Sequence, residues 1–398
     1  MKKKVFVFSH AMEIGGAERA LLGLLNCMDY SKYDVDLFLM RHSGELMELI
    51  PEDVNLLPPD RKYSSLAIPI INVVKNGEFD IAFGRITGKL NAEKFNKKMS
   101  YCNSEAALEY SHKCTQKYMP MMSDKEYDLA ISFLTPHYFV SEKVRAKKKI
   151  AWIHTDYSYL NLDIASELKM WSAYDNIISI SNDVTKAFLT KFPSLENKII
   201  LIENISSKVF IESQAEMFDV TDEMSNSDIK LLSVGRFCEA KNFDNVPEIA
   251  SIIKSKGIDF KWYIIGYGGD EQLIRSKITE FNMEDTVIIL GKKENPYPYM
   301  KVCDIYVQPS RYEGKAVTVC EALLLNKPVV ITDYPTAHSQ IKNGFDGIIV
   351  PLDNQGCANA LAEIMTDKEL LNKLIENMEQ TDYSNESEID KVYELIED

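Results

Sequence analysis

The chain has 398 residues, of which 45% are hydrophobic and 26% are charged, and its formal net charge is −15. That length exceeds what one hydrophobic core normally supports, so two globular domains are expected. Residues 1–204 carry 26 basic and 26 acidic side chains, whereas residues 205–398 carry 19 and 34. This balance excludes nucleic acid as a partner class, because phosphate backbones bind basic surfaces.

The apolar runs and the cysteines indicate a compartment. No run of 18 apolar residues is present, so no transmembrane helix is predicted. Lys2–Lys4 is followed by only four apolar residues, which is too short for a signal peptide and predicts a first strand. The seven cysteines include no CxxC pair and indicate neither a disulfide framework nor a zinc site. We expect a cytoplasmic protein whose neutral N-terminal half can lie against the inner face of a membrane.

Apolar runs alternate with helical patterns through residues 1–208 and predict a first doubly wound parallel sheet. The predicted strands are Val5–Ser9, Val35–Met40, Leu129–Phe133, Ile150–Ile153, Ile177–Ile180 and Ile199–Ile202. Residues 85–126 interrupt this alternation, because they are polar and rich in lysine and tyrosine. A helical insertion is the plain interpretation. The alternative is a contact with acceptor or membrane through a basic face of Lys94, Lys97, Lys98, Lys113 and Lys117.

Residues 209–228 are acidic and without clear periodicity, which predicts an interdomain linker. A second alternation over residues 229–380 predicts a second doubly wound domain. Its strands are expected at Ile229–Val234, Trp262–Ile265, Val287–Leu290, Ile305–Gln308, Val329–Thr332 and Ile348–Pro351.

Residues 381–398 predict a last helix that returns to the first domain. Ile389, Val392, Tyr393 and Ile396 form one apolar stripe, which must be buried against something. Residues 363–398 carry 12 acidic and 3 basic side chains. The neutral first domain therefore suits this segment better than the acidic second domain.

The segment Asp304–Leu325 carries the strongest site signal in the chain. A buried strand ends at Pro309, a polar turn follows, and a helix starts near Lys315. Glu313 lies on the turn and Glu321 one turn into the helix. Ligands of open parallel sheets bind at this edge, and a helix N-terminus suits a phosphate. The alternative is that both glutamates are solvated surface residues.

Further candidates lie at other carboxyl strand ends of the second domain. Arg236 and Lys241 flank a strand-to-helix crossing, where two cations suit a diphosphate; solvated loop charges are the alternative. Gly266 begins the GYGG turn, whose backbone can approach a ligand closely, although tight turns need glycine in any case.

The first domain offers candidates in the same kind of position. Gly16 precedes a helix, so nearby N–H groups can meet a phosphate. His154 follows a strand, as His10 and His137 do, and an ordinary loop histidine is the alternative for each. Because all these groups lie at carboxyl strand edges, two facing sheets could bring them to one cleft.

Together these motifs carry a family resemblance. They are GGAER at 15–19, VGR at 234–236 with KN at 241–242, GYGG at 266–269, and PSRYEG at 309–314 with EAL at 321–323. In this order the chain resembles the retaining family-4 glycosyltransferases of GT-B fold along essentially its whole length. The resemblance implies two Rossmann-like doubly wound domains facing across a cleft, with a C-terminal helix crossing back to the first domain.

The resemblance also implies roles. Arg236 and Lys241 would hold the donor diphosphate and neutralise the leaving group, so that neither metal nor cofactor is needed. Glu321 would bind the ribose, while Glu313 and His154 would lie by the reacting sugar. The donor-binding set would be Gly16, Gly235, Arg236, Lys241, Gly266, Lys315, Ala316, Val317 and Glu321. Family members often have phenylalanine and a small residue where this chain has Lys315 and Ala316, which leaves the donor sugar open.

The function implied is transfer of a sugar, with retention, from a UDP-linked donor to a saccharide or lipid-linked acceptor during surface polysaccharide or cell-wall glycan synthesis. Retention would arise by same-face attack, because no carboxylate pair of the double-displacement kind is evident. Two alternatives remain: a UDP-sugar epimerase of the same fold, and a non-catalytic sugar-nucleotide-binding partner.

Overall fold

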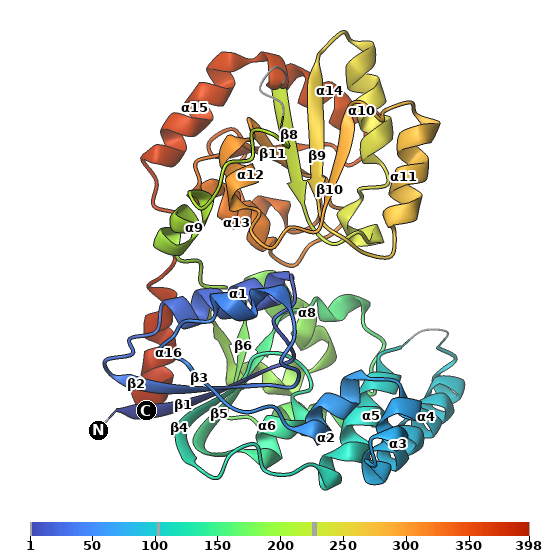
Figure 1. The fold of residues 1–398 in the computed structure, drawn as a ribbon, viewed down its shortest axis with the longest axis vertical. Helices are drawn as coiled ribbons and strands as arrows, with labels where there is room; N and C mark the ends of the chain where they lie inside the picture. Colours follow the sequence, from blue (N-terminus) through green and yellow to red (C-terminus); the bar gives the residue numbers. More distant parts are fainter. Residues whose placement is uncertain (1, 102–103, 225–228, 398) are drawn as a thin grey trace. The chain divides into compact units, whose positions relative to one another are not determined.

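The computed structural model describes residues 2–101, 104–224 and 229–397, which form two compact units (Figure 1). The first unit comprises Met1–Asn204 together with Ser387–Asp398, and the second comprises Ile205–Glu386. The chain therefore leaves the first unit four residues before the boundary expected at residue 208. No helix among the described residues is long and apolar enough to cross a membrane.

The first unit contains a seven-stranded parallel sheet in the order β3-β2-β1-β4-β5-β6-β7. Its strands are β1 (Lys3–Ser9), β2 (Tyr33–Leu39), β3 (Asn55–Leu56), β4 (Glu126–Ser132), β5 (Arg145–Ile153), β6 (Asn176–Ser179) and β7 (Ile199–Leu201). Its helices are α1 (Gly16–Asn26), α2 (Arg61–Ser64), α3 (Ile70–Lys75), α4 (Phe79–Met99), α5 (Ala106–Thr115), α6 (Tyr138–Lys143), α7 (Ile164–Ser172), α8 (Asn182–Lys191) and α16 (Glu388–Glu397). Six of these strands were expected, and the two-residue β3 is too short to leave a pattern.

The interruption expected over residues 85–126 is helical, although α4 begins earlier, at Phe79. Residues 102–103 of that range lie outside the described part. Helices α4 and α5 pack closely because α4 carries glycine at the contact. A Cβ on Gly88 would lie 2.6 Å from the carbonyl oxygen of Tyr110, so no larger residue fits there.

The second unit contains a six-stranded parallel sheet in the order β10-β9-β8-β11-β12-β13. Its strands are β8 (Ile229–Val234), β9 (Phe260–Ile265), β10 (Val287–Gly291), β11 (Ile305–Gln308), β12 (Val329–Thr332) and β13 (Gly347–Val350). Its helices are α9 (Lys208–Ala215), α10 (Val246–Ser255), α11 (Glu271–Glu280), α12 (Tyr297–Val302), α13 (Val317–Leu324), α14 (Asn354–Thr366) and α15 (Lys368–Glu379). This order is that of the dinucleotide-binding Rossmann fold, which confirms the expected class.

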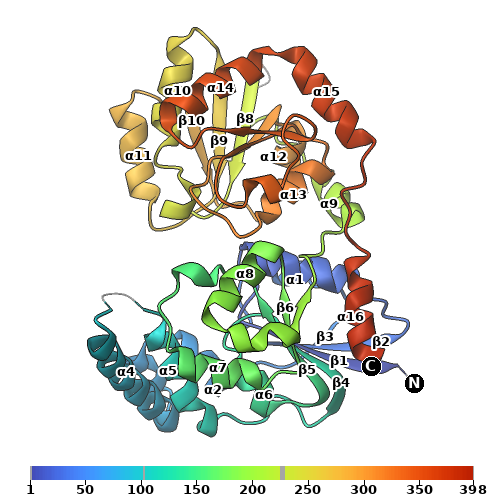
Figure 2. The same ribbon diagram turned by 180° about the vertical axis from the view of Figure 1, so that it is seen from behind.

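Both faces of the second sheet are buried, because successive strand residues enter two different cores (Figures 1 and 2). Leu231 packs with helices α10, α11 and α14, whereas Leu232 packs with α9, α12, α13 and α15. Burial on both sides explains why β8 and β11 are mainly apolar, although β8 also contains Lys230 and Ser233 and β11 ends in Gln308.

The linker expected at 209–228 is wrong for its first part. Residues from Lys208 to Ala215 form α9, whose Ile211 and Ala215 are buried, and Val220 and Met224 join the same core. The Nδ2 atom of Asn295 also donates to the carbonyl oxygen of Gln214 at 2.7 Å. The apolar residues are spaced irregularly in an acidic stretch, so the pattern resembled a linker. Residues 225–228 lie outside the described part.

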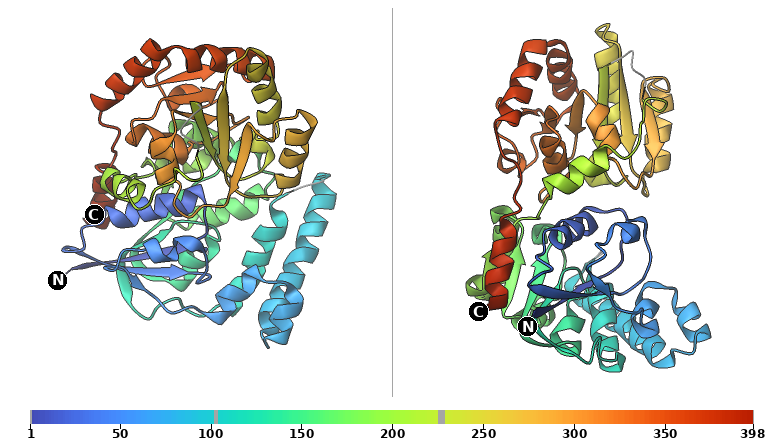
Figure 3. Two further views of the ribbon diagram at one scale, coloured as in Figure 1. Left: turned by 45° about the horizontal axis from the view of Figure 1, so that its top comes forward. Right: turned by 60° about the vertical axis from the view of Figure 1, so that its left-hand side comes forward.

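Helix α16 belongs to the first unit (Figure 3). Tyr393 stacks on Tyr33 with ring centroids 4.6 Å apart. Its hydroxyl accepts from the Asp29 N–H at 2.8 Å and lies 3.1 Å from the carbonyl oxygen of Cys27. Val392 on the same helix is fully buried. The apolar stripe read from the sequence thus packs on the first unit.

Candidate active site

Two loops of the second unit meet at the carboxyl ends of neighbouring strands β8 and β11. One loop follows Val234, and the other follows Gln308. The guanidinium of Arg311 forms two bonds to the carboxylate of Asp244, at 2.9 and 2.8 Å, and its backbone N–H donates to Ala240 at 2.8 Å. A two-pronged bond of this kind fixes orientation as well as distance. The two loops therefore form one structural unit.

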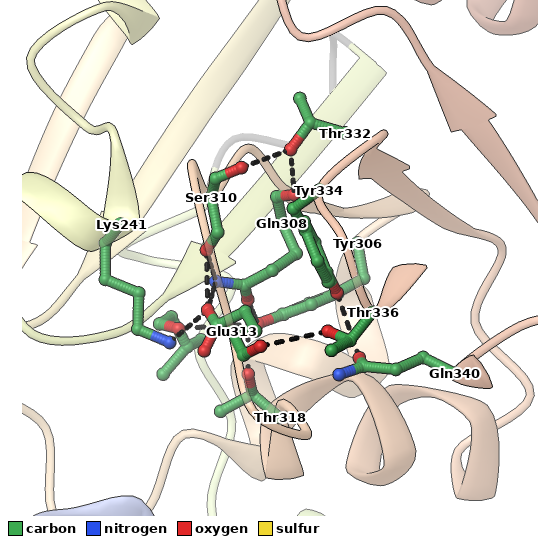
Figure 4. A network of polar contacts seen from close by, with 11 residues as sticks. Lys241, Tyr306, Gln308, Ser310, Glu313, Thr318, Thr332, Tyr334, Thr336 and Gln340 are labelled. Carbon is green, nitrogen blue, oxygen red and sulfur yellow. Dashed lines mark hydrogen bonds and ion pairs between the residues drawn. The ribbon is translucent and has the colours of Figure 1, made fainter. Parts of the chain in front are cut away.

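Glu313 lies at the centre of a polar network in these loops (Figure 4). Its Oε1 atom accepts from the Lys241 ammonium at 2.5 Å, from Ser310 Oγ at 2.6 Å and from Gln308 Nε2 at 3.2 Å. The side chain of Glu313 is 11% exposed and that of Lys241 is 19% exposed. The structure thus joins two residues that the sequence had assigned to separate parts of a donor.

A second layer of hydroxyls holds this centre in place (Figure 4). Tyr306 and Thr318 both donate to Gln308 Oε1, at 2.7 and 3.2 Å. Thr336 donates to the carbonyl oxygen of Glu313 at 2.9 Å, and Thr332 donates to that of Ser310 at 2.6 Å. Because buried polar groups need partners, this layer explains how Gln308 and Ser310 can be fully buried.

The glycines at these strand ends are needed for close packing. A Cβ on Gly235 would lie 3.2 Å from Lys241 Cδ, so the lysine side chain passes directly over this residue. Gly266 has a φ of +156°, and a Cβ there would lie 1.9 Å from the carbonyl oxygen of Gly235. Arg236 between them is exposed and forms no ion pair within the described ranges. The loop that carries Lys241 thus also offers an exposed guanidinium to an anion.

Helix α13 begins after Ala316 with no side-chain cap and no acidic residue in its first turn. The free N–H groups near Val317 therefore form the positive end of the helix dipole, which suits an anion. Lys315 precedes this helix start and is partly buried. Glu321 lies one turn further and is 2% exposed, and its Oε1 accepts from Tyr297 at 2.8 Å. The structure thus places all the predicted residues of this segment on one loop and helix.

The remaining two candidates lie in the first unit. Gly16 is the first residue of α1, but Glu18 lies over that end, because a Cβ on Gly15 would be 2.2 Å from its carboxylate. His154 follows β5 and lies parallel to Trp152, with ring centroids 6.2 Å apart. Burial lowers the pKa of His154 to about 3, so its imidazole is neutral. Within the described residues its buried Nε2 atom has no hydrogen-bond partner.

His154 lines a cavity of about 310 Å³ that the sequence did not reveal. His112 and His137 also line it, and burial lowers the pKa of each to about 3. Glu109 and Glu167 also lie in its lining, and burial raises the pKa of both carboxyls; exposed Glu105 borders the same cavity. The only sequence signal was the spacing of Glu109 and His112 three residues apart, which places them on one side of α5.

No three His, Cys, Asp or Glu side chains gather into a possible metal site within the part of the chain described. The predicted residues thus fall into two groups. Arg236, Lys241, Glu313 and Glu321 belong to the second unit with Gly235, Gly266 and the start of α13, whereas Gly16 and His154 belong to the first.

Solved structures with the same fold cover almost the whole chain. HepE from Anabaena, in complex with UDP, superposes with a TM-score of 0.67 and 15% identity over 99% of both chains. A mutant of TarM from Staphylococcus aureus, in complex with fondaparinux, α-GlcNAc-glycerol and UDP, gives 0.68 and 14% over 100% of both. At such identities these likenesses show the fold, which is that of the GT-B glycosyltransferases.

The sequence similarity to a known family lies in the second unit. Residues 218–381 match the family of glycosyl transferases group 1. A Campylobacter jejuni relative is 28% identical over 161 residues, which are 40% of this chain and 43% of the relative; it is named N-acetylgalactosamine-N,N'-diacetylbacillosaminyl-diphospho-undecaprenol 4-alpha-N-acetylgalactosaminyltransferase. The capsular polysaccharide biosynthesis glycosyltransferase CapM of Staphylococcus aureus is 24% identical over 54% of this chain and 58% of its own length. The match to the glycosyl transferases of group 1 thus spans most of the second unit, Ile205–Glu386.

Proposed function

We propose that this protein is a retaining glycosyltransferase of family 4. It would move a sugar from a UDP-linked donor to a saccharide or lipid-linked glycan acceptor in surface polysaccharide or cell-wall glycan synthesis. The observation that carries the proposal is the joined pair of loops at the ends of β8 and β11. The loop after β8 carries exposed Arg236 and also Lys241, whose ammonium pairs with Glu313 on the loop after β11.

The chemistry of these groups suits a departing nucleoside diphosphate. An arginine fork and a lysine point charge can share the negative charge that grows on the leaving group. The uncapped start of α13 adds N–H donors. Because Glu313 fixes the Lys241 ammonium beforehand, little reorganisation is needed when the charge develops. In this proposal Glu321 binds the ribose, and Glu313 lies by the donor sugar.

The first unit would receive the acceptor. The cavity beside His154 is lined by neutral imidazoles and by two buried carboxyls, Glu109 and Glu167, whose pKa values burial raises. We therefore expect it to suit hydroxyl-bearing ligands better than anions. The names of the two relatives mention a diphospho-undecaprenol-linked glycan and capsular polysaccharide biosynthesis. These names support a glycan or lipid-linked acceptor and a peripheral contact with a membrane.

The test is a panel of nucleotide sugars, measured by thermal shift and by slow hydrolysis of the donor without acceptor. We expect UDP and one UDP-sugar to raise the melting temperature, and excess EDTA to leave hydrolysis unchanged, because two cations already serve the leaving group. Loss of activity that magnesium or manganese restores would remove metal independence from the proposal. A UDP-sugar epimerase would instead convert its substrate without releasing sugar, and a non-catalytic partner would bind UDP without turnover.

A further inference from the structure

One side of helix α4 exposes large apolar side chains to solvent. Phe79 is 67% exposed, Phe83 62%, Ile86 46% and Leu90 52%. Their spacings of four, three and four residues place them along one face of the helix. We call these four residues the outer α4 stripe. Helix α4 lies with α3 and α5 at one margin of the first unit, away from the strands (Figures 1 and 3).

The outer α4 stripe is not the side that packs into the protein. The buried residues of the helix are Ile81, Ala82, Gly84, Gly88 and Ala92. A surface helix normally carries polar residues opposite its buried side, but α4 is apolar on both. Neighbouring α3 adds two more exposed apolar side chains, Ile71 at 62% and Val74 at 38%. An apolar surface of this extent on a folded protein indicates an interaction site.

The net charge around the outer α4 stripe is positive, whereas that of the whole chain is negative. Residues 71–99 contain six basic and three acidic side chains, although the protein carries −15. Two of the acidic residues are already paired, since Asp80 contacts Lys62 at 2.5 Å and Glu78 contacts Arg61 at 3.8 Å. Exposed lysines follow on α4 at positions 89, 94, 97 and 98. Within the described ranges none of these four lysines has an acidic partner.

We propose that the outer α4 stripe inserts shallowly into the surface of a membrane rich in anionic lipid, with the lysines of α4 against the phosphate headgroups. Aromatic and aliphatic residues on one face with lysines beside them are what an interfacial helix requires. A second copy of the chain fits this surface poorly, because a two-fold contact would set the lysines of one stripe against those of the other. The inference locates the membrane contact of the proposed function.

Tryptophan fluorescence gives a direct test, because Trp152, Trp171 and Trp262 are all at most 2% exposed. A Phe83→Trp variant is expected to shift its emission to the blue on vesicles of phosphatidylglycerol and phosphatidylcholine, and to be quenched by brominated acyl chains. The matched control is Leu273→Trp on α11, where the native leucine is 45% exposed. This control should show neither effect. A solvent-like, unquenched emission from Phe83→Trp on bound protein would overturn the proposal.

Vesicle flotation tests the same surface by removing it. Combined Phe79→Ser and Phe83→Ser substitutions should lower binding to anionic vesicles at least ~tenfold, since each phenylalanine leaves an apolar environment. Replacing Lys94, Lys97 and Lys98 by glutamine should weaken binding only where anionic lipid is present. Leu273→Ser is the control for exposed apolar residues. Unchanged binding in both stripe variants would overturn the inference, as would a dimer or a protein complex that the serine variant dissolves.

The outcome is separable from that of the proposed function. Donor hydrolysis without vesicles should be equal in wild type and stripe variants, because none of the substituted residues lies in the second unit. Vesicle binding without any hydrolysis would leave the membrane contact standing and remove the enzyme. Hydrolysis without vesicle binding would support the enzyme and overturn the membrane contact.

Discussion

The two sheets end in polar loops of opposite electrostatic character. At the ends of β8 and β11, Lys241 and Glu313 form an ion pair, and Arg236 is exposed. Beside the end of β5, burial lowers the pKa of His154 and raises that of Glu109, so both are held neutral. Charge that is paired and accessible suits an anionic ligand, whereas neutralised groups in a cavity suit hydroxyls. The same type of parallel sheet thus carries a charged site in the second unit and a cavity of neutral groups in the first.

The largest expected effect concerns the charged side of this comparison. Arg236→Ala or Lys241→Ala should weaken UDP binding by ~10–150-fold, because a charge-assisted contact is worth about 1.5–3 kcal/mol. Calorimetry with UDP measures this. Lys254→Ala, which removes an exposed lysine paired with Asp259 in the same unit, should bind UDP as wild type does. If both site variants kept wild-type affinity, the loops would not be the diphosphate site.

Glu313 and Glu321 should separate chemistry from binding. Glu313→Gln is expected to spare UDP affinity and to lower kcat at least ~tenfold, because the Lys241 ammonium loses the carboxylate that fixes its position. Glu321→Gln should weaken UDP affinity instead, because its carboxylate would bind the ribose. Steady-state kinetics and calorimetry on the same preparations decide the matter. The opposite pattern would exchange the two roles.

The sequence specified the second sheet better than its surroundings. The ends of β8 and β11 were predicted to the residue, because mainly apolar strands buried on both faces differ clearly from the polar loops that follow them. Helix α9 was missed, because only two of its eight residues, Ile211 and Ala215, are buried, which is too few to show a periodic pattern. The segment near residue 85 showed weak helical periodicity, since α4 is apolar on two opposite sides.

For the candidate site, too, the sequence predicted some features and missed others. Strand ends and motif resemblance selected Arg236, Lys241 and Glu313, but not the bond between the last two, which joins residues 72 positions apart. No local pattern encodes such a contact. The cavity in the first unit was missed because buried Glu109 looks in sequence like any solvated helix residue. Its neutral state arises from tertiary packing alone.

A smaller effect is expected where the chain end completes the first unit. Tyr393→Ala should lower the stability of this unit by about 2–3 kcal/mol, because it removes a stacked ring and the hydroxyl contacts to the α1–β2 connection. Tyr393→Phe keeps the stacking and should cost about half as much. Exposed Glu394 on the same helix provides the control, Glu394→Ala. Thermal unfolding followed by circular dichroism measures all three, and equal melting curves would show that α16 contributes nothing.

The smallest expected effect is a pH dependence of the stability of the first unit, caused by the buried carboxyls and imidazoles of the cavity beside His154. Burial raises the pKa of Glu109 from 4.5 to about 8. The stability this proton contributes is therefore fully present below pH 4.5 and lost as the pH rises through 8. Burial lowers the pKa of the cavity histidines from 6.5 to about 3, and their contribution is lost only as the pH falls below 6.5. Between pH 6.5 and 8 the histidine contribution is constant and, of these groups, only the carboxyls change the stability. Burial raises the pKa of Glu167 to about 7, so its contribution is lost mainly in the lower half of this range. The contribution of Glu109 is lost across the whole range, at up to about 1.4 kcal/mol per pH unit.

Glu109→Gln should remove that loss, since an amide mimics the protonated carboxyl and does not titrate. We expect the melting temperature of wild type to fall between pH 6.5 and 8 by about 3–6 °C more than that of the variant, because 1 kcal/mol corresponds to about 2–4 °C in a unit of this size. Glu126→Gln, at an exposed position of β4, should keep the wild-type slope. Parallel slopes for wild type and Glu109→Gln would mean that Glu109 is charged in the folded protein. The cavity would then hold an anion of its own, and a ligand with a cationic group would suit it better than a sugar hydroxyl.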